Sequence, residues 1–241
     1  MNFFTTELPV WVSILFLVVI PIPIYLIAQL GQKGASNPFT SVKPKNVFYG
    51  ILAFYLLYLT YVTIACFQGL FSVQSLPPKI MMFTAIPLLF FLSVFVLNLP
   101  YTKRILRKTH LSDLIRIHIF RLIGSFFLIM GFYKTVPTLF SLSAGLGDIT
   151  VALTSIWVSN IVLKEKTYSK KVTFLWNTFG LLDILMTSFL AFWFTKLSIE
   201  TGSLGVDVLT EFPFCFIPSF APATIIFLHL CVYKKLLEKG I

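Results

Sequence analysis

The sequence predicts an all-α integral membrane protein, a bundle of seven transmembrane helices, from its composition and from the length of its apolar runs. Of 241 residues, 57% are hydrophobic and 12% are charged, whereas soluble domains average about 45–50% apolar and about 25% charged residues. A helix needs roughly 20 mostly apolar residues to cross a bilayer, and it satisfies its own backbone hydrogen bonds there. The runs are continuous rather than alternating, which excludes a β-barrel.

Seven runs meet this length, and the short connections between them predict one membrane domain, residues 1–241. The predicted spans are about 10–30, 47–67, 80–99, 114–132, 138–163, 172–195 and 212–233. Residues 1–8 contain Glu7 and no Lys or Arg, so we expect the first run to be a retained helix rather than a cleaved signal peptide. The connection 197–211 is long, and it is either a plain surface loop or a cover over one end of the bundle.

The placement of the basic residues predicts the orientation. They gather after the first, third, fifth and seventh runs, at Lys33, Lys43, Lys45, Lys103, Arg104, Arg107, Lys108, Lys164, Lys166, Lys170, Lys171, Lys234, Lys235 and Lys239. The other connections hold Lys79, Lys134 and Lys196. The positive-inside rule therefore puts the N-terminus outside and the C-terminus in the cytoplasm. The net charge of +10 then indicates anionic lipid head groups at the cytoplasmic face of a plasma or inner membrane, and no nucleic acid.

Seven helices that start outside permit a 3+1+3 arrangement. In it, the first three and the last three runs are parallel repeats and the fourth run links them, as in some small transporters. Pro87 and Pro222 lie at comparable depths in the third and seventh runs, the positions that such a repeat would equate. Each is also expected to bend its helix and to free a backbone carbonyl.

Three charged residues fall inside the predicted spans, namely Arg121, Asp148 and Asp183. Each costs at least about 2.5–3.5 kcal/mol at a helix centre, so such residues mark functional sites or mutual pairs. At a rise of about 1.5 Å per residue, Asp183 lies near the midplane, Arg121 about 12 Å from the inner end and Asp148 in the outer half. Depth thus favours an Arg121–Asp183 pair, and an Arg121–Asp148 pair is expected to need a tilted or broken helix.

Four polar or aromatic residues are predicted at the inner side of these charges. His118 lies three residues before Arg121 and shares its helix face, and His229, Asn177 and Trp176 fall at similar depth in the last two runs. They form either a polar vestibule below Asp183 or a hydrogen-bonded network that locks the helices together.

The fifth run is longer than one span requires, and Ala144–Gly145–Leu146–Gly147–Asp148 is rich in small residues. Two interpretations stay open. The helix is broken near Gly145, which would put Asp148 in the first turn of a new helix. Alternatively, Gly145 and Ala152 allow close helix packing.

The sequence predicts no cofactor and no metal. Cys66, Cys215 and Cys231 lack CxxC spacing. Cys66 and Cys215 fall near the outer ends of their helices, where they are small packing residues or, if those helices are neighbours, a disulfide. The topology resembles that of the retinal-binding rhodopsins, but the seventh run has no lysine before Lys234 for a Schiff base, so retinal is not expected. Nucleotide-binding and hydrolase motifs are also missing.

Two classes of function remain. We favour a small transporter or permease in which Asp148 and Asp183 bind a proton, cation or other small molecule, while Arg121 supplies the counter-charge or contacts an anionic substrate. The alternative is a non-transporting protein, either a receptor or a subunit that binds a protein partner. A membrane enzyme acting on lipid is a weaker version of this alternative, because it needs His118, His229 and Arg121 near the head groups.

Overall fold

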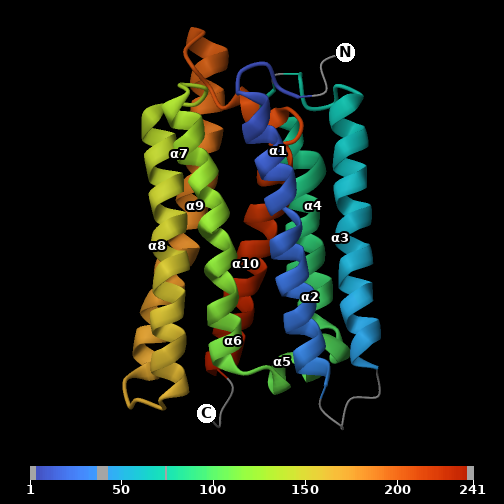
Figure 1. Ribbon diagram of the computed structural model, residues 1–241, viewed down its shortest axis with the longest axis vertical. Helices are drawn as coiled ribbons and strands as arrows, with labels where there is room; N and C mark the ends of the chain where they lie inside the picture. Colours follow the sequence, from blue (N-terminus) through green and yellow to red (C-terminus); the bar gives the residue numbers. More distant parts are fainter. Residues whose placement is uncertain (1–3, 37–42, 74, 238–241) are drawn as a thin grey trace.

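The computed structural model describes residues 4–36, 43–73 and 75–237, and within these ranges the chain forms helices and no strand. Seven helical segments are long and apolar enough to cross a membrane (Figure 1). These segments, called spans 1–7, cover Val10–Ala35, Pro44–Phe67, Met81–Asn98, Leu111–Phe132, Thr138–Leu163, Ser169–Thr201 and Phe216–Leu237. The seven predicted membrane helices are therefore confirmed.

Several spans are built from more than one helical segment. In chain order the elements are α1 (Val10–Val19), α2 (Pro21–Ala35), α3 (Pro44–Phe67), η1 (Met81–Ala85), α4 (Ile86–Phe90), η2 (Phe91–Phe95), η3 (Val96–Asn98), α5 (Pro100–Lys108), α6 (Leu111–Arg116), η4 (Ile117–Gly124), α7 (Ser125–Phe132), α8 (Thr138–Leu163), α9 (Ser169–Thr201), η5 (Asp207–Thr210) and α10 (Phe216–Leu237). Of the η segments, η1 and η2 are π-helices and η3, η4 and η5 are 3₁₀-helices.

The helix of span 5 covers the expected range, whereas the helices of spans 6 and 7 begin and end at other residues than the apolar runs do. Helix α9 is longer than predicted at both ends, because its polar terminal turns continue the helix past the apolar run. Helix α10 begins at Phe216, since the chain from Phe212 to Cys215 forms turns that include a cis Phe212–Pro213 bond.

The helices surround two buried spans. Figure 1 shows α8 and α9 on one side of the molecule, α3 on the other, and α10 behind α1 and α2 in the middle. Spans 4 and 7 are 56% buried over their most apolar windows, whereas span 6 is 17% buried. Polar groups on spans 4 and 7 therefore need hydrogen-bond partners inside the protein, on the neighbouring helices.

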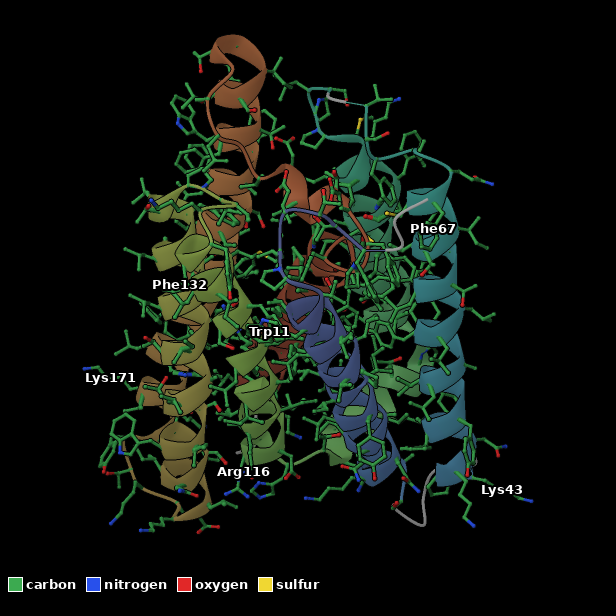
Figure 2. All side chains as sticks on the ribbon, turned by 45° about the horizontal axis from the view of Figure 1, so that its top comes forward. Trp11, Lys43, Phe67, Arg116, Phe132 and Lys171 are labelled. Carbon is green, nitrogen blue, oxygen red and sulfur yellow. The ribbon has the colours of Figure 1, made fainter. Side chains whose placement is uncertain are left out.

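The two ends of the bundle differ in charge. The connections after α2, α5 and α8 and the end of α10 carry most of the basic residues, and we call this end the basic end. Lys43 and Arg116 lie there, whereas Phe67 and Phe132 lie at the opposite end (Figure 2). Lys239 falls outside the described residues.

Two prolines interrupt the regular backbone, and Pro87 does so as expected. Pro21 separates α1 from α2 in span 1. Pro87 has no N–H to give to Phe83, four residues earlier, and the Phe83 carbonyl instead accepts a hydrogen bond of 3.1 Å from the hydroxyl of Tyr61 on α3. The π-helices η1 and η2 flank this proline, so span 3 has an irregular backbone over most of its length.

The long connection between α9 and α10 packs against the end opposite the basic end. Val206, Val208 and Leu209 are buried, and Val208 is fully enclosed. Residues of η5 form one wall of a cavity there, together with Thr5 and Thr6 of the N-terminal segment. This connection is thus a cover rather than a plain surface loop.

Candidate functional site

The backbone of span 4 aligns the polar residues of the site. Its middle, η4, is a 3₁₀-helix of eight residues, although runs of 3₁₀-helix longer than three or four residues are uncommon. At three residues per turn, side chains at i and i+3 eclipse one another. His118, Arg121 and Gly124 therefore lie in one straight column, and all three are buried.

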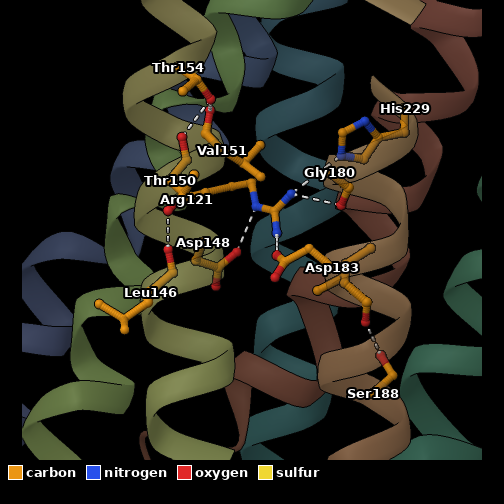
Figure 3. A network of polar contacts seen from close by, with 11 residues as sticks. Arg121, Leu146, Asp148, Thr150, Val151, Thr154, Gly180, Asp183, Ser188 and His229 are labelled. Atoms are coloured by element: carbon orange, nitrogen blue, oxygen red, sulfur yellow. Dashed lines mark hydrogen bonds and ion pairs between the residues drawn. The ribbon is translucent and has the colours of Figure 1, made fainter. Parts of the chain in front are cut away.

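Arg121 is the centre of this site. Its side chain is fully buried and extends between α8 and α9 (Figure 3). The Nε–H donates to Asp148 Oδ1 at 2.6 Å, and Nη2 forms an ion pair with Asp183 Oδ2. Nη1 donates to the backbone carbonyl of Gly180 at 3.1 Å and lies 3.4 Å from Nε2 of His229. Every nitrogen of the guanidinium group thus has an acceptor from a neighbouring helix.

The structure decides between the two interpretations of the segment around Asp148. Helix α8 is continuous from Thr138 to Leu163, which excludes the break near Gly145. The Arg121–Asp148 pair forms without it. A 3₁₀-helix rises about 2.0 Å per residue instead of about 1.5 Å, so η4 carries Arg121 deeper than the α-helical estimate allowed. The close-packing interpretation of Gly145 holds, because a Cβ there would lie 2.6 Å from Leu128 Cδ2 on α7.

Three glycines let the acidic and imidazole side chains reach this depth. A Cβ atom on Gly124 would overlap the Asp148 side chain, and one on Gly147 would overlap the carboxylate of Asp183. A Cβ on Gly180 would lie 2.6 Å from Cε1 of His229. Each glycine therefore occupies a place where the helix surface has to give way to a polar group of the site.

His229 is held by a reciprocal pair of hydrogen bonds. Nδ1 of its ring lies 2.7 Å from Oδ1 of Asn177, and Nδ2 of Asn177 donates to the His229 carbonyl at 3.1 Å. Since the amide oxygen is an acceptor, His229 carries its proton on Nδ1 and turns the lone pair of Nε2 toward Arg121. His229 thus adds a neutral acceptor to the two carboxylates.

His118 and Trp176 complete the group on the side of the basic end. The His118 ring lies 4.3 Å from that of His229 and 5.3 Å from that of Trp176, measured between centroids. Trp176 donates from Nε1 to Oγ1 of Thr154 at 3.1 Å. Both ring nitrogens of His118 are buried, and neither has a hydrogen-bond partner among the described residues.

The structure therefore brings all seven predicted site residues into one contiguous cluster of spans 4–7: Arg121, Asp148, Asp183, His118, His229, Asn177 and Trp176. Sequence reasoning missed the Gly180 carbonyl and the roles of Gly124 and Gly147. Gly124 lies three residues beyond Arg121 and so shares its helix face, and that spacing was the available signal. A backbone acceptor gives no signal in the sequence. His118 and His229 are both fully buried.

Two adjoining cavities lead toward the cluster from the end opposite the basic end. A cavity of about 60 Å³ is lined by Arg121 and Asp148. It shares Met81, Leu209 and other lining residues with the larger cavity of about 470 Å³ under the cover formed by η5. The small cavity is large enough to hold water or a small ion.

The larger cavity has an acidic wall. Asp207 and Glu211 line it, together with Lys79. Burial, along with the nearby Glu211 and Asp207 carboxylates, raises the pKa of Glu7 above its ordinary value. Two carboxylates against one lysine give the wall of this cavity a negative charge, which favours cations over anions there.

The charges of the cluster do not cancel. With both carboxylates ionised, Asp148 and Asp183 outweigh Arg121 by one negative charge. One proton or one monovalent cation would restore neutrality in a region where an unpaired charge is costly. Among the described residues, no group of three or more His, Cys, Asp or Glu side chains is arranged to hold a metal ion.

Comparison with known families places the chain in one of them. The family model described as Domain of unknown function (DUF8737) matches residues 77–237, more than half of the chain, and the chain belongs to this family. All seven residues of the cluster lie within the matched section. Comparison with curated proteins and with solved structures found no match.

Removal of Arg121 is expected to be severely destabilising, because it leaves two buried carboxylates without their counter-charge. Arg121→Leu should cost on the order of 3–5 kcal/mol, and Arg121→Leu/Asp183→Asn should recover part of that loss. Thermal unfolding in detergent of both single variants and the double variant measures the coupling. Arg116→Leu, on the same span but exposed, is the matched control and should change stability by about 0.5 kcal/mol or less. Strict additivity would contradict the pair.

Gly147→Ala should also loosen the site, because the added methyl group displaces the Asp183 carboxylate. We expect a loss of about 1–3 kcal/mol in unfolding free energy. Gly50→Ala is the control, since a Cβ at Gly50 meets nothing within 4 Å and both changes gain the same helix propensity. Equal stability of the two variants in thermal unfolding would refute the close approach at Gly147.

Proposed function

We propose that this protein is a small transporter in which Asp148 and Asp183 share a proton or a monovalent cation, with Arg121 as the counter-charge. The observation that carries the proposal is an arginine enclosed by two carboxylates, one of which lines a cavity that adjoins a wider entrance. Such a site combines an unbalanced charge inside the bundle with a route to it. Buried ionisable groups of this kind mark ion and proton pathways in membrane proteins.

The occupied donors of Arg121 favour a cation over an anionic substrate. All of its nitrogens already face acceptors of the protein, so an anion would have to displace one of them. A proton or cation needs no such exchange, because a carboxylate oxygen has further lone pairs to offer. The acidic wall of the larger cavity under η5 also favours a positively charged ligand.

Irregular helices supply parts that could move. Mid-helix 3₁₀ segments often mark hinges, and π-helices occur frequently at functional sites. The 3₁₀ segment η4 carries Arg121 itself, and the π-helix η1 contributes Met81 to both cavities. A shift of η4 toward α-helix would rotate His118 and Arg121 relative to each other. A local change of helix type would therefore move both side chains together.

The proposal includes an orientation and a membrane. The basic end faces the cytoplasm of a plasma or inner membrane, so the two cavities open outside. The 3+1+3 arrangement belongs to the same proposal. Its support is the comparable position of Pro87 and Pro222, both in spans that pack against each other along α4 and α10.

Transport is tested in proteoliposomes that contain a pH-sensitive dye. They are given an inward proton gradient and an external pool of amino acids, sugars and organic acids. Wild type should carry protons above the rate of empty liposomes, and Asp148→Asn and Asp183→Asn should reduce that excess by at least tenfold. Asp113→Asn, which removes a carboxylate paired with Lys33 near the basic end, is the control and should keep the wild-type rate. Wild-type flux in Asp183→Asn would refute the proposed site.

The orientation is tested by labelling in intact cells. In a chain with Cys66, Cys215 and Cys231 replaced by alanine, Lys79→Cys should react with a membrane-impermeant maleimide. Lys170→Cys should react only after the cells are opened, because its loop belongs to the basic end. The reverse pattern would invert the topology.

A further inference from the structure

A third cavity, also of about 470 Å³, lies near the basic end, and no residue of the Arg121 cluster lines it. It is bounded by α2 and α3 on one side and by span 3 and α5 on the other, and Leu114 of α6 and Leu228 of α10 line its inner wall. Its walls are mostly apolar, and they include Gly50, Ile51 and Phe54 of α3 and Ile105 of α5. Figure 1 shows α5 lying below the end of α4, beside the lower ends of α2 and α3.

The depth of this cavity matches one leaflet of a bilayer. It runs along α3 from Val47 to Tyr55, which is about 12 Å at 1.5 Å per residue, close to half of a hydrocarbon core about 30 Å thick. The rings of Phe54 and Phe91, with centroids 5.4 Å apart, bridge α3 and η2 beside it. Gly50 leaves open space, since a Cβ there would meet nothing within 4 Å. The cavity therefore has the depth and lining that an acyl chain requires.

Helix α5 gives the cavity a basic mouth. One face of α5 lines the cavity through Tyr101, Ile105 and other residues. Lys103 and Arg104 of the same helix do not line it; Lys103 is partly buried and Arg104 is exposed. Lys45 is exposed at the start of α3. Within residues 4–36, 43–73 and 75–237, these three basic side chains form no ion pair, in contrast to Lys33, which is paired with Asp113.

A polar atom at the same mouth also lacks a partner. The hydroxyl of Tyr101 is buried, and among the described residues nothing hydrogen-bonds to it. Tyr101 lines the cavity one helical turn before Ile105. Among the described residues, Tyr101 thus brings an unpartnered polar group to a mostly apolar wall.

We infer that this cavity is a binding site for an anionic phospholipid. One acyl chain occupies the apolar cavity, and the phosphate lies near Lys103, Arg104 and Lys45. The charge complementarity selects an anionic over a zwitterionic lipid with the same tails, since each basic side chain near a negative head group contributes attraction. The inference does not depend on the proposed transport function.

The test uses the full-length protein in a neutral detergent, titrated with phosphatidylglycerol or with phosphatidylcholine of the same acyl chains. The readout is the rise in unfolding temperature, which grows as a ligand saturates the native state. Phosphatidylglycerol should saturate at a concentration on the order of tenfold lower than phosphatidylcholine. Lys103→Gln/Arg104→Gln should raise the half-saturating concentration of phosphatidylglycerol by about tenfold.

The matched control is Lys170→Gln/Lys171→Gln. It removes the same net charge from another exposed connection of the basic end and should leave the phosphatidylglycerol titration unchanged. Gly50→Phe should fill the cavity, and we expect it to abolish the rise in unfolding temperature while the lipid-free protein keeps its stability. Equal saturation by the two lipids, or equal effects of the two charge variants, would overturn the inference.

Discussion

Arg121 is a fully buried cation, and the arrangement of spans 4–7 depends on satisfying it. An unpaired guanidinium in the hydrocarbon region would cost several kcal/mol, so each neighbouring helix has to present an acceptor at the right depth. Helix α8 gives Asp148, α9 gives Asp183 and the Gly180 carbonyl, and α10 gives His229. The glycines at 124, 147 and 180 follow from this requirement, because larger residues would hold the partners away.

The same interaction limits how the protein can work. Two carboxylates around one arginine leave a negative charge that a single proton or cation can neutralise, and the change is local and reversible. Because Arg121 contacts three helices at once, protonation of either carboxylate would weaken one of those contacts while the others persist. Such a protonation would allow the helix packing to change while Arg121 stays buried. Arg121 belongs to the 3₁₀ segment η4, so η4 is the backbone nearest to that change.

The cavities near the two ends of the bundle differ in polarity. Toward the end opposite the basic end, adjoining cavities with an acidic wall reach the charged cluster. Toward the basic end, the rings of His118, His229 and Trp176 pack against one another beside the cluster. The cavity near that end is mostly apolar, and no residue of the cluster lines it. The proposed ion site and the proposed lipid site therefore use different cavities, with no lining residue in common.

The sequence by itself determined the seven spans and the residues of the charged cluster. Both follow from the cost of hydrocarbon to polar groups, which a sequence displays as long apolar runs interrupted by few charges. Tertiary structure alone decided that Arg121 pairs with both acids. The depth estimate assumed an α-helical rise, and nothing in Ile117–Gly124 signals a 3₁₀-helix. Tertiary structure also decided whether α8 is broken or closely packed, because small residues such as Gly145 and Gly147 are typical of helix breaks and of close helix packing alike. Only the neighbouring helices, pressed against those glycines, distinguish the two cases.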